Sequence, residues 1–443
     1  MKIRYSAVLS LFLLLPFALV TAQEVAFKEY DLDNGLHVIL HQDNTAPVVT
    51  VSVMYHVGAK DEDPQRTGFA HFFEHLLFEG TKNIKKGEWF KLVTSNGGRN
   101  NANTTDDRTY YYEVFPSNNV ELGLWMESER MLHPVINQDG VDTQNEVVKE
   151  EKRLRVDDQP YGKILEAIKK NMFKKHPYRW STIGSMEHLD AATLDEFLAF
   201  NKKFYVPNNA VLVVAGDIDS TRTERMVKDY FGSIPKGEAI VRNFAQEDPV
   251  TEQFKATAYD ANIQIPAIIA AYRTPSFKTR DARVLDMIST YLSSGKSSKL
   301  YKRMVDDKKM ALAIQAVNLS QEDYGIYAVF ALPLGETTLT ALAQEFDEEI
   351  AKLQLELISE KDYEKLQNKF ENQFVNSNSS IQGIASSLAT YYMLYGDTSL
   401  INNEINIYRS ITREEIMEVA KKYLNPNQRL LLEYLPEKQK ENQ

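Results

Sequence analysis

The residues best suited to chemistry form the short run His71–His75, in the order His-Phe-Phe-Glu-His. Thr67 is a candidate N-cap for a helix that would carry this run. In a helix, side chains four residues apart lie on one face, so His71 and His75 can present two imidazoles to one metal ion. Glu74 lies beside that face and can reach a metal-bound water. An apolar stripe of helical spacing supports the helix: Phe69, Phe72, Phe73, Leu76 and Leu77. The order His-x-x-Glu-His is the reversed form of the zinc-peptidase helix motif.

A third ligand is expected to be a carboxylate, because the chain has no cysteine. The segment 142–155 has the pattern of a charged helix and holds Glu146, Glu150 and Glu151. Adjacent helical residues point about 100° apart, so Glu150 and Glu151 should not both bind one ion. The pattern alone leaves all three glutamates open. It also predicts three apolar residues that face the core: Val147, Val148 and Leu154.

The other histidines that could compete for a metal have no paired spacing, and we interpret each as a hydrogen-bonded or exposed side chain. They are His56, His133, His176 and His188.

Composition narrows the class of protein. The chain has 443 residues, of which 43% are hydrophobic and 26% charged, which excludes collagen, coiled coil and wholesale disorder. The absence of cysteine excludes a thiol nucleophile and a disulfide scaffold. The chain has no Gly-x-Ser-x-Gly elbow, the motif that would indicate a serine hydrolase. A net charge of −11 argues against nucleic acid as a partner.

The N-terminus has the pattern of a secretory signal peptide. Lys2 and Arg4 precede an apolar run over residues 7–20, and small residues follow at Thr21 and Ala22. We expect cleavage after residue 22. The alternative is a membrane anchor, but the run is shorter than the ~20 residues that span a bilayer. No membrane span is expected in the mature chain.

The rest of the chain contains an internal repeat. Thr193 and Thr412 each open a helical pattern that ends in a Lys-Lys pair, an aromatic residue and Pro-Asn, and the matched positions differ by 219 throughout. Pro47 and Pro266 have the same offset. We therefore expect two homologous halves, residues 23–235 and 253–443, joined by a linker over residues 236–252. Strands that alternate apolar and polar residues favour an α+β fold, with a mostly antiparallel or mixed sheet covered by helices in each half.

These motifs resemble the insulinase/pitrilysin family of zinc peptidases over essentially the whole mature chain, in the two-domain bacterial type similar to mitochondrial processing peptidase subunits. The HxxEH helix is present at His71–His75, and the family's third ligand, a glutamate about 75 residues beyond the second histidine, corresponds to Glu151. Further blocks resemble the family at residues 33–36, 101–104 with 109–112, 147–153 with 159–162, and 297–303.

The resemblance implies the roles of particular residues. His71, His75 and Glu151 would bind one zinc ion per chain, with a fourth position for water, and Glu74 would be the general base. Gln144 stands where many members have a glutamate that supports the ligands. The edge strand with Asn101, Ala102, Asn103 and Thr104 would bind peptide substrate, and Arg303 belongs to the second half's characteristic helix. In that half Asp286, Ser289 and Thr290 stand where the metal motif would be, so it has none.

The family's two-chain members suggest a partner. Their substrate-binding arginine is followed seven residues later by tyrosine, whereas seven residues after Arg303 this chain has Met310. We therefore expect another chain to supply the pair, which favours a heterodimer with a related zinc-free subunit over a homodimer. The family habit indicates a periplasmic peptidase that cleaves internal bonds of peptides or unfolded segments. The alternatives are a non-catalytic or substrate-binding subunit and a two-lobed periplasmic binding protein.

Overall fold

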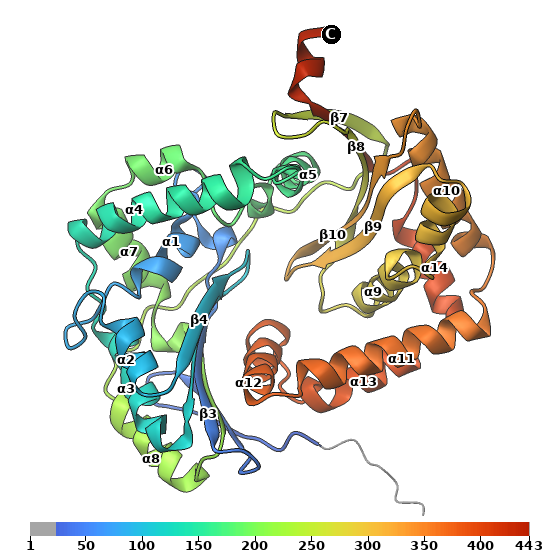
Figure 1. The fold of residues 1–443 in the computed structure, drawn as a ribbon. Coiled ribbons are helices and arrows are strands. Elements are labelled where there is room, and N and C mark those ends of the chain that lie inside the picture. The colour runs from blue at the N-terminus through green and yellow to red at the C-terminus, as the bar shows by residue number, and fades with distance from the viewer. Residues whose placement is uncertain (1–23, 443) are drawn as a thin grey trace, which may run out of the picture.

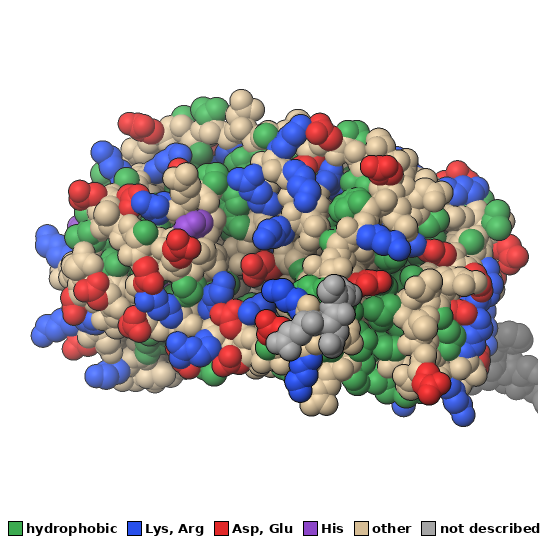
Figure 2. All heavy atoms as spheres, turned by 90° about the horizontal axis from the view of Figure 1, so that it is seen from above, with side chains coloured by type: hydrophobic (Ala, Val, Ile, Leu, Met, Phe, Trp, Pro, Cys, Tyr) green, Lys and Arg blue, Asp and Glu red, His purple; other side chains and the backbone are tan. Residues whose placement is uncertain are grey.

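The computed structural model describes residues 24–442, so the predicted signal peptide lies outside the described residues. The chain forms two lobes side by side, each a twisted sheet with helices packed on it (Figure 1). Seen from above, the lobes join into one elongated body with side chains of both charges over its surface (Figure 2). Within the described residues, no helix is both long enough and apolar enough to cross a membrane.

The sheet of the first lobe has six strands in the order β1-β2-β6-β3-β5-β4. Strands β2 and β6 are parallel, and every other neighbouring pair is antiparallel. The strands span Lys28–Asp31 (β1), His37–Gln42 (β2), Val48–Tyr55 (β3), Arg99–Thr104 (β4), Thr109–Pro116 (β5) and Ala210–Gly216 (β6).

The sheet of the second lobe repeats this order without the extra edge strand, as β7-β11-β8-β10-β9. Again one pair, β7 and β11, is parallel and the others are antiparallel. The strands span Phe254–Asp260 (β7), Ala267–Pro275 (β8), Ala311–Ser320 (β9), Tyr324–Pro333 (β10) and Leu430–Pro436 (β11). The predicted fold class, two homologous halves with mixed sheets covered by helices, is confirmed.

The repeat is also visible in the local structure. Helices α7 (Leu194–Phe204) and α14 (Arg413–Tyr423) begin 219 residues apart and have the same length. Each starts with a capping box, in which the side chain of Thr193 or Thr412 accepts from the third backbone N–H of the helix and a glutamate returns the bond. The matched residues of the two halves therefore stabilise matched helix starts.

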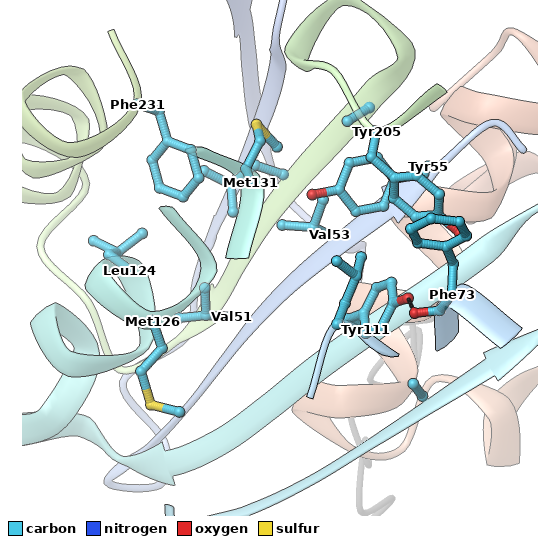
Figure 3. Close-up of a cluster of buried hydrophobic side chains, with 14 of the residues drawn as sticks. Val51, Val53, Tyr55, Phe73, Tyr111, Leu124, Met126, Met131, Tyr205 and Phe231 are labelled. Atoms are coloured by element: carbon cyan, nitrogen blue, oxygen red, sulfur yellow. Dashed lines mark hydrogen bonds between the residues drawn. The ribbon is translucent and has the colours of Figure 1, made fainter. Parts of the chain in front are cut away.

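Most helices of the first lobe cover one face of its sheet (Figure 1). The helices of the first half, including α5, which packs on the second sheet, span Phe69–Leu76 (α1), Trp89–Ser95 (α2), Val120–Leu132 (α3), Gln138–Lys152 (α4), Ile164–Met172 (α5), Met186–Ala191 (α6), Leu194–Phe204 (α7) and Ser220–Phe231 (α8). Figure 3 shows the core between this face and the helices: Val51 and Val53 of β3 lie among Leu124 and Met126 of α3 and Phe231 of α8.

The second lobe is covered in the same way. Its helices span Arg280–Ser293 (α9), Leu339–Leu355 (α10), Glu360–Ser377 (α11), Ile381–Thr390 (α12), Leu400–Ser410 (α13) and Arg413–Tyr423 (α14).

The other face of each sheet is covered by a helix from the opposite half. Helix α12, from the second half, buries Ile384 and Leu388 against Ile39 and Val213 of the first sheet. Helix α5, from the first half, buries Ile168 and Met172 against the second sheet, in a cluster that includes these strand residues: Ala267, Ile269, Ala271, Leu430 and Leu432. Figure 1 shows both helices in these positions. The two lobes are therefore joined by an exchange of equivalent helices.

A buried ionic network adds to this exchange at the turn between β9 and β10, residues 321–323. The ammonium of Lys60, whose side chain is 1% exposed, lies 2.7 Å from Glu322 and 3.0 Å from both Asp323 and Asp107. His56 reaches the same Glu322 carboxylate at 2.7 Å. This turn of the second lobe is thus held by Lys60 and His56 of the first.

The same network holds the hairpin turn between β4 and β5 in the first lobe. Asp106 accepts from Lys169 of α5 at 2.7 and 2.9 Å and from Gln321. Asp107 accepts from the Tyr178 hydroxyl and, at 3.0 Å, from the backbone N–H of Glu322. The end of edge strand β4 is therefore braced by both lobes.

We predict that Glu322→Gln lowers the free energy of unfolding at pH 7 by about 3 kcal/mol, because it leaves Lys60 buried with less negative charge around it. Urea denaturation measures this, with Glu360→Gln as the control. Glu360 is an exposed partner of Arg413, and its loss should change stability by no more than about 0.5 kcal/mol. Equal effects of the two substitutions would contradict the structural role of the network.

The difference in unfolding free energy between wild type and Glu322→Gln should also depend on pH in a defined direction. Burial alone would raise the pKa of Glu322, but the neighbouring His56 and Lys60 outweigh burial and lower it. Because the folded pKa lies below the unfolded value of about 4.3, the carboxylate stabilises the fold above that pH and stops doing so as pH falls. The gap between wild type and Glu322→Gln should therefore be full at pH 7 and shrink below about pH 4. A gap that grows on acidification would contradict this.

Candidate metal centre

Helix α1 carries the His-x-x-Glu-His run, and its N-terminus is built differently from the prediction. The N-cap is Gly68, at a φ of +100° that favours glycine, and not Thr67. The buried carboxylate of Glu62 accepts from the backbone N–H groups of Gly68 at 2.8 Å and Ala70 at 2.9 Å. Glu62, six residues before Gly68, therefore caps the helix with its side chain. The Thr67 hydroxyl instead contacts Nδ1 of His188 at 2.9 Å.

The apolar face of α1 fixes where its polar face points. All five residues of the predicted stripe are buried. Phe69 stacks on Phe197 of α7 with ring centroids 4.5 Å apart, and Phe72 packs on the same ring in a tilted arrangement at 4.7 Å. The ring of Phe73 lies 5.1 Å from that of Tyr205. The Tyr111 hydroxyl donates to the backbone oxygen of Phe73, the dashed line in Figure 3. These contacts turn His71 and His75 away from the core toward α4.

The structure brings His71, His75 and Glu151 together. Oε2 of Glu151 lies 3.0 Å from Nε2 of His75 and 3.5 Å from Nε2 of His71, and one potential ligand atom from each residue lies within 4.8 Å of the others. Within residues 24–442 this is the one group of three or more such side chains close enough to share a metal ion. Two imidazole nitrogens and one carboxylate oxygen suit zinc, and three protein ligands leave a fourth position open.

The electrostatics of the cluster also suit a cation. Burial, together with the neighbouring His75, lowers the pKa of His71 to about 4, so its imidazole is neutral at pH 7, as a metal ligand must be. The His75 imidazole lowers the pKa of Glu151, so its carboxylate is charged. Oε2 of Glu151 is buried and makes no hydrogen bond of good geometry. The residues present therefore fit a divalent metal.

Helix α4 explains why one glutamate of three reaches the histidines. Side chains of Glu146 and Glu150 are 77% and 50% exposed and pair with Lys149 and Arg153 on the outer surface. Glu151, about 100° further round the helix, is 14% exposed and faces α1. The prediction that three apolar residues of segment 142–155 face the core is wrong for two of them. Val147 is 43% and Leu154 55% exposed, and only Val148 is buried. The apolar pattern of this segment therefore overestimates its buried face.

Arg155 is a residue of this site that the sequence reasoning missed. It lies in a π-helical turn, Arg153–Asp157, that follows α4, and its guanidinium contacts Oε1 of Glu151 at 2.5 Å. Because Oε1 faces Arg155, Oε2 is left to face the histidines. The spacing of four residues after Glu151 was the only signal in the sequence.

Glu74 lies beside the cluster and outside it. Its Oε2 accepts from the Thr104 hydroxyl at 2.7 Å. Burial raises the pKa of Glu74, although the Thr104 hydrogen bond opposes this. A carboxylate fixed in orientation beside these three side chains is placed to exchange a proton with a water molecule there.

Strand β4, which ends at Thr104, is the edge of the first sheet. Its partner β5 takes one side, with Asn101 opposite Tyr112 and Asn103 opposite Tyr110. Asn101 and Asn103 are exposed, and Ala102 is buried. The predicted substrate strand therefore has the form expected of an edge that can accept a further strand.

Two predicted residues lie apart from the metal cluster. Gln144 donates to Glu79 at 2.5 Å, and Glu79 in turn pairs with Lys86. The guanidinium of Arg303 is surrounded by carboxylates of α10: Glu345, Glu348 and Glu349. The structure therefore gives Gln144 a hydrogen bond to Glu79 and does not bring Arg303 to the histidines.

The four histidines predicted to be hydrogen-bonded or exposed all have polar neighbours. His56 contacts Glu322 at 2.7 Å, His133 contacts Glu129 at 3.2 Å, and His176 lies 3.4 Å from Asp323. His188 contacts Thr67.

Comparison with known proteins identifies the class. The family model described as insulinase (peptidase family M16) matches residues 37–185, and the model described as peptidase M16 inactive domain matches residues 191–370. The chain belongs to the insulinase family, the M16 peptidases.

Individual relatives extend over most of the chain. It is 28% identical over 400 residues to the zinc protease PqqE of Helicobacter pylori, an alignment that covers 90% of each chain. It is 24% identical over 411 residues to an uncharacterized zinc protease, YmxG, of Bacillus subtilis, which covers 91% of this chain and 97% of the relative.

Solved structures agree on the fold. The crystal structure of a protease from Helicobacter pylori superposes with a TM-score of 0.88 at 27% identity, over 93% of this chain and all of the other. The periplasmic protease PqqL of Escherichia coli superposes with a TM-score of 0.76 at 18% identity. That match covers 94% of this chain but 48% of PqqL, so this chain spans about half of the longer protein.

We predict that Glu151→Gln weakens zinc binding by more than about 100-fold, because loss of a ligand should exceed the 10- to 100-fold cost of losing a residue that only orients one. Glu150→Gln is the matched control and should keep the metal, since Glu150 points to solvent. Competition with a zinc chelator measures both. Equal loss of zinc in the two variants would contradict the geometry of α4.

Proposed function

We propose that this chain is a zinc-dependent endopeptidase in which His71, His75 and Glu151 hold the metal. The observation that supports it most directly is the convergence of these three side chains beside a buried, oriented Glu74. A zinc ion bound there would polarise the scissile carbonyl and lower the pKa of a bound water to roughly 7.

In this proposal Glu74 moves the proton. Its carboxylate takes a proton from the attacking water and returns it to the nitrogen of the departing amine. The Thr104 hydroxyl holds one carboxylate oxygen, which leaves the other free to face the water. Such general acid–base catalysis is typically worth ~10²–10⁴-fold in rate.

The substrate would bind as an added strand along β4. Backbone groups of an edge strand can pair with an extended peptide in any sequence, which supports action on internal bonds of peptides or unfolded segments. The network around the Asp106 and Asp107 turn would keep this edge in register with Glu74, since Thr104 immediately precedes the turn.

We predict that Glu74→Gln loses peptidase activity by at least about 100-fold but still binds one zinc ion per chain. The amide keeps the shape of the side chain and cannot accept the proton. Metal analysis of the purified variant together with cleavage of a fluorogenic peptide tests both parts. Loss of zinc from Glu74→Gln would place Glu74 among the ligands and contradict the assigned role.

We further propose that the active enzyme is a pair of chains, with a related zinc-free subunit favoured over a second copy. Two observations support this. The chain spans about half of PqqL, and its Arg303 is occupied by α10 carboxylates and lies away from the metal cluster. A second chain would then supply the groups that hold the substrate carbonyl opposite the metal.

The prediction is that the isolated chain binds zinc but cleaves peptides slowly, and that an added partner with the missing arginine and tyrosine raises kcat. Sedimentation and kinetics on the isolated chain measure this. Full activity as a monomer or homodimer, unchanged by such a partner, would refute the pairing without affecting the metal assignment.

The place of action is proposed as the periplasm, on the strength of the signal-peptide pattern in residues 1–22. A non-catalytic subunit remains the second candidate function, and Glu74→Gln distinguishes it, because a silent subunit would show no activity to lose. Membership of a peptidase family removes the reason to propose a solute-binding protein.

A further inference from the structure

A pocket lies beside the two segments that carry the metal ligands. Its volume is about 380 Å³, within the range of pockets that hold small ligands. Pro64 and Thr67 from the segment before α1, Lys152 at the end of α4 and residues of α5 line it. The segment that leads into α6, residues 179–185, and His188 of α6 close it. The proposed reaction uses none of these side chains.

The charge of the pocket lining is opposite in sign to the net charge of the chain. The chain has 62 acidic against 51 basic residues, yet the pocket is lined by Lys152, Lys170 and Arg179 against the single carboxylate of Glu166. Even if Glu166 neutralises one cation, two remain. Figure 2 looks down on the face formed by α4, α5 and α6 and shows Lys and Arg side chains gathered near its middle.

The walls of the pocket are fixed by hydrogen bonds. The Lys152 ammonium donates to the backbone oxygen of Gly184 at 3.0 Å. The indole N–H of Trp180 donates to the backbone oxygen of Ala59 at 2.8 Å, and the Arg179 guanidinium lies 5.4 Å from the ring of Trp180. Charged donors held in place before a ligand arrives lose less entropy when they bind it.

His188 adds a further hydrogen-bond donor. The Thr67 hydroxyl accepts from the backbone N–H of Ser185 at 3.1 Å and contacts Nδ1 of His188 at 2.9 Å, while the Thr67 N–H also approaches Nδ1 at 3.3 Å. Nδ1 thus accepts from both groups of Thr67, which leaves Nε2 to carry a proton. His188 therefore offers an N–H donor, alongside the hydroxyls of Ser181 and Ser185 that also line the pocket.

We propose that this pocket binds an acidic side chain of a peptide substrate. The inference rests on the proposed peptidase function. Lys170 and Arg179 would pair with the carboxylate, and the faces of Trp180 and Pro64 would cover its methylene groups or backbone. Since Lys152 follows Glu151 and Thr67 precedes the cap of α1, the occupant would contact both elements that carry the metal ligands. The site would thus favour acidic peptides.

Binding can be measured without turnover in zinc-loaded Glu74→Gln protein. The probes are two blocked pentapeptides, acetyl-Ala-Ala-Glu-Glu-Ala-amide and its Gln-Gln counterpart. Calorimetry should show the acidic peptide binding at least about tenfold more tightly, and the added substitutions Lys170→Gln and Arg179→Gln should abolish that preference. Lys361→Gln, an exposed lysine on α11, is the matched control and should keep it.

Equal affinity for the two peptides, or a preference that survives the double substitution, would overturn the proposal. Should the double variant fold poorly by circular dichroism, the single exposed change Lys170→Gln must still reduce the preference. Millimolar inorganic phosphate is the third probe, and tighter binding of phosphate than of the acidic peptide would show a small-anion site instead. An inactive wild-type enzyme would refute the peptidase function while leaving these binding results interpretable.

Discussion

The structure depends on covering both faces of two sheets with helices from one chain. Each half packs most of its helices on one face and leaves the other face apolar, as the buried Ile39 and Val213 of the first sheet show. Helices α5 and α12 supply the missing cover by crossing to the opposite lobe. Each fully buried Leu or Ile is worth about 1.5–3 kcal/mol relative to exposure, so several such residues in each helix make separation of the lobes costly. The relative position of the lobes is therefore a property of the core.

That constraint reaches the metal centre through α4 and α5. Helix α4 packs on α1 in the first lobe, and the chain then passes through the π-helical turn with Arg155 into α5 on the second sheet. Glu151 is thus held in a segment anchored at both ends in different lobes. On the other side of Glu74, the β4–β5 turn is fixed by Lys169 of α5 and by the turn at residues 321–323. The half without a metal cluster therefore supports the geometry of the half that has one.

Features set by local sequence patterns could be predicted better than features set by long-range contacts. The repeat, the mixed sheets, the α1 helix and its apolar stripe follow from periodicity and spacing, which local physics determines. Thr67 was a reasonable cap, but the helix is capped by Glu62, whose reach depends on a loop that no local pattern describes. The exposed Val147 and Leu154 show that an apolar residue on a helix indicates a possible contact and not its extent.

Selection of the third metal ligand needed the same long-range information. Helical geometry separates Glu150 from Glu151 but does not say which one faces α1, and the family resemblance favoured Glu151 before the structure placed it. The basic pocket combines residues from positions 64 to 188 and could not be found from spacing. The exchange of α5 and α12 was equally hidden, because an apolar face predicts burial without naming the surface that buries it.

The exchanged helices also bear on how such a chain could be assembled. α5 (Ile164–Met172) and α12 (Ile381–Thr390) hold corresponding places in the two repeats. A single repeat made alone would leave one sheet face bare, and two copies could cover both faces only by trading this helix. The present chain has the form of such a helix-swapped dimer joined end to end. Duplication and fusion would preserve that contact. One copy would then no longer need to carry a metal, and its residues could take other roles.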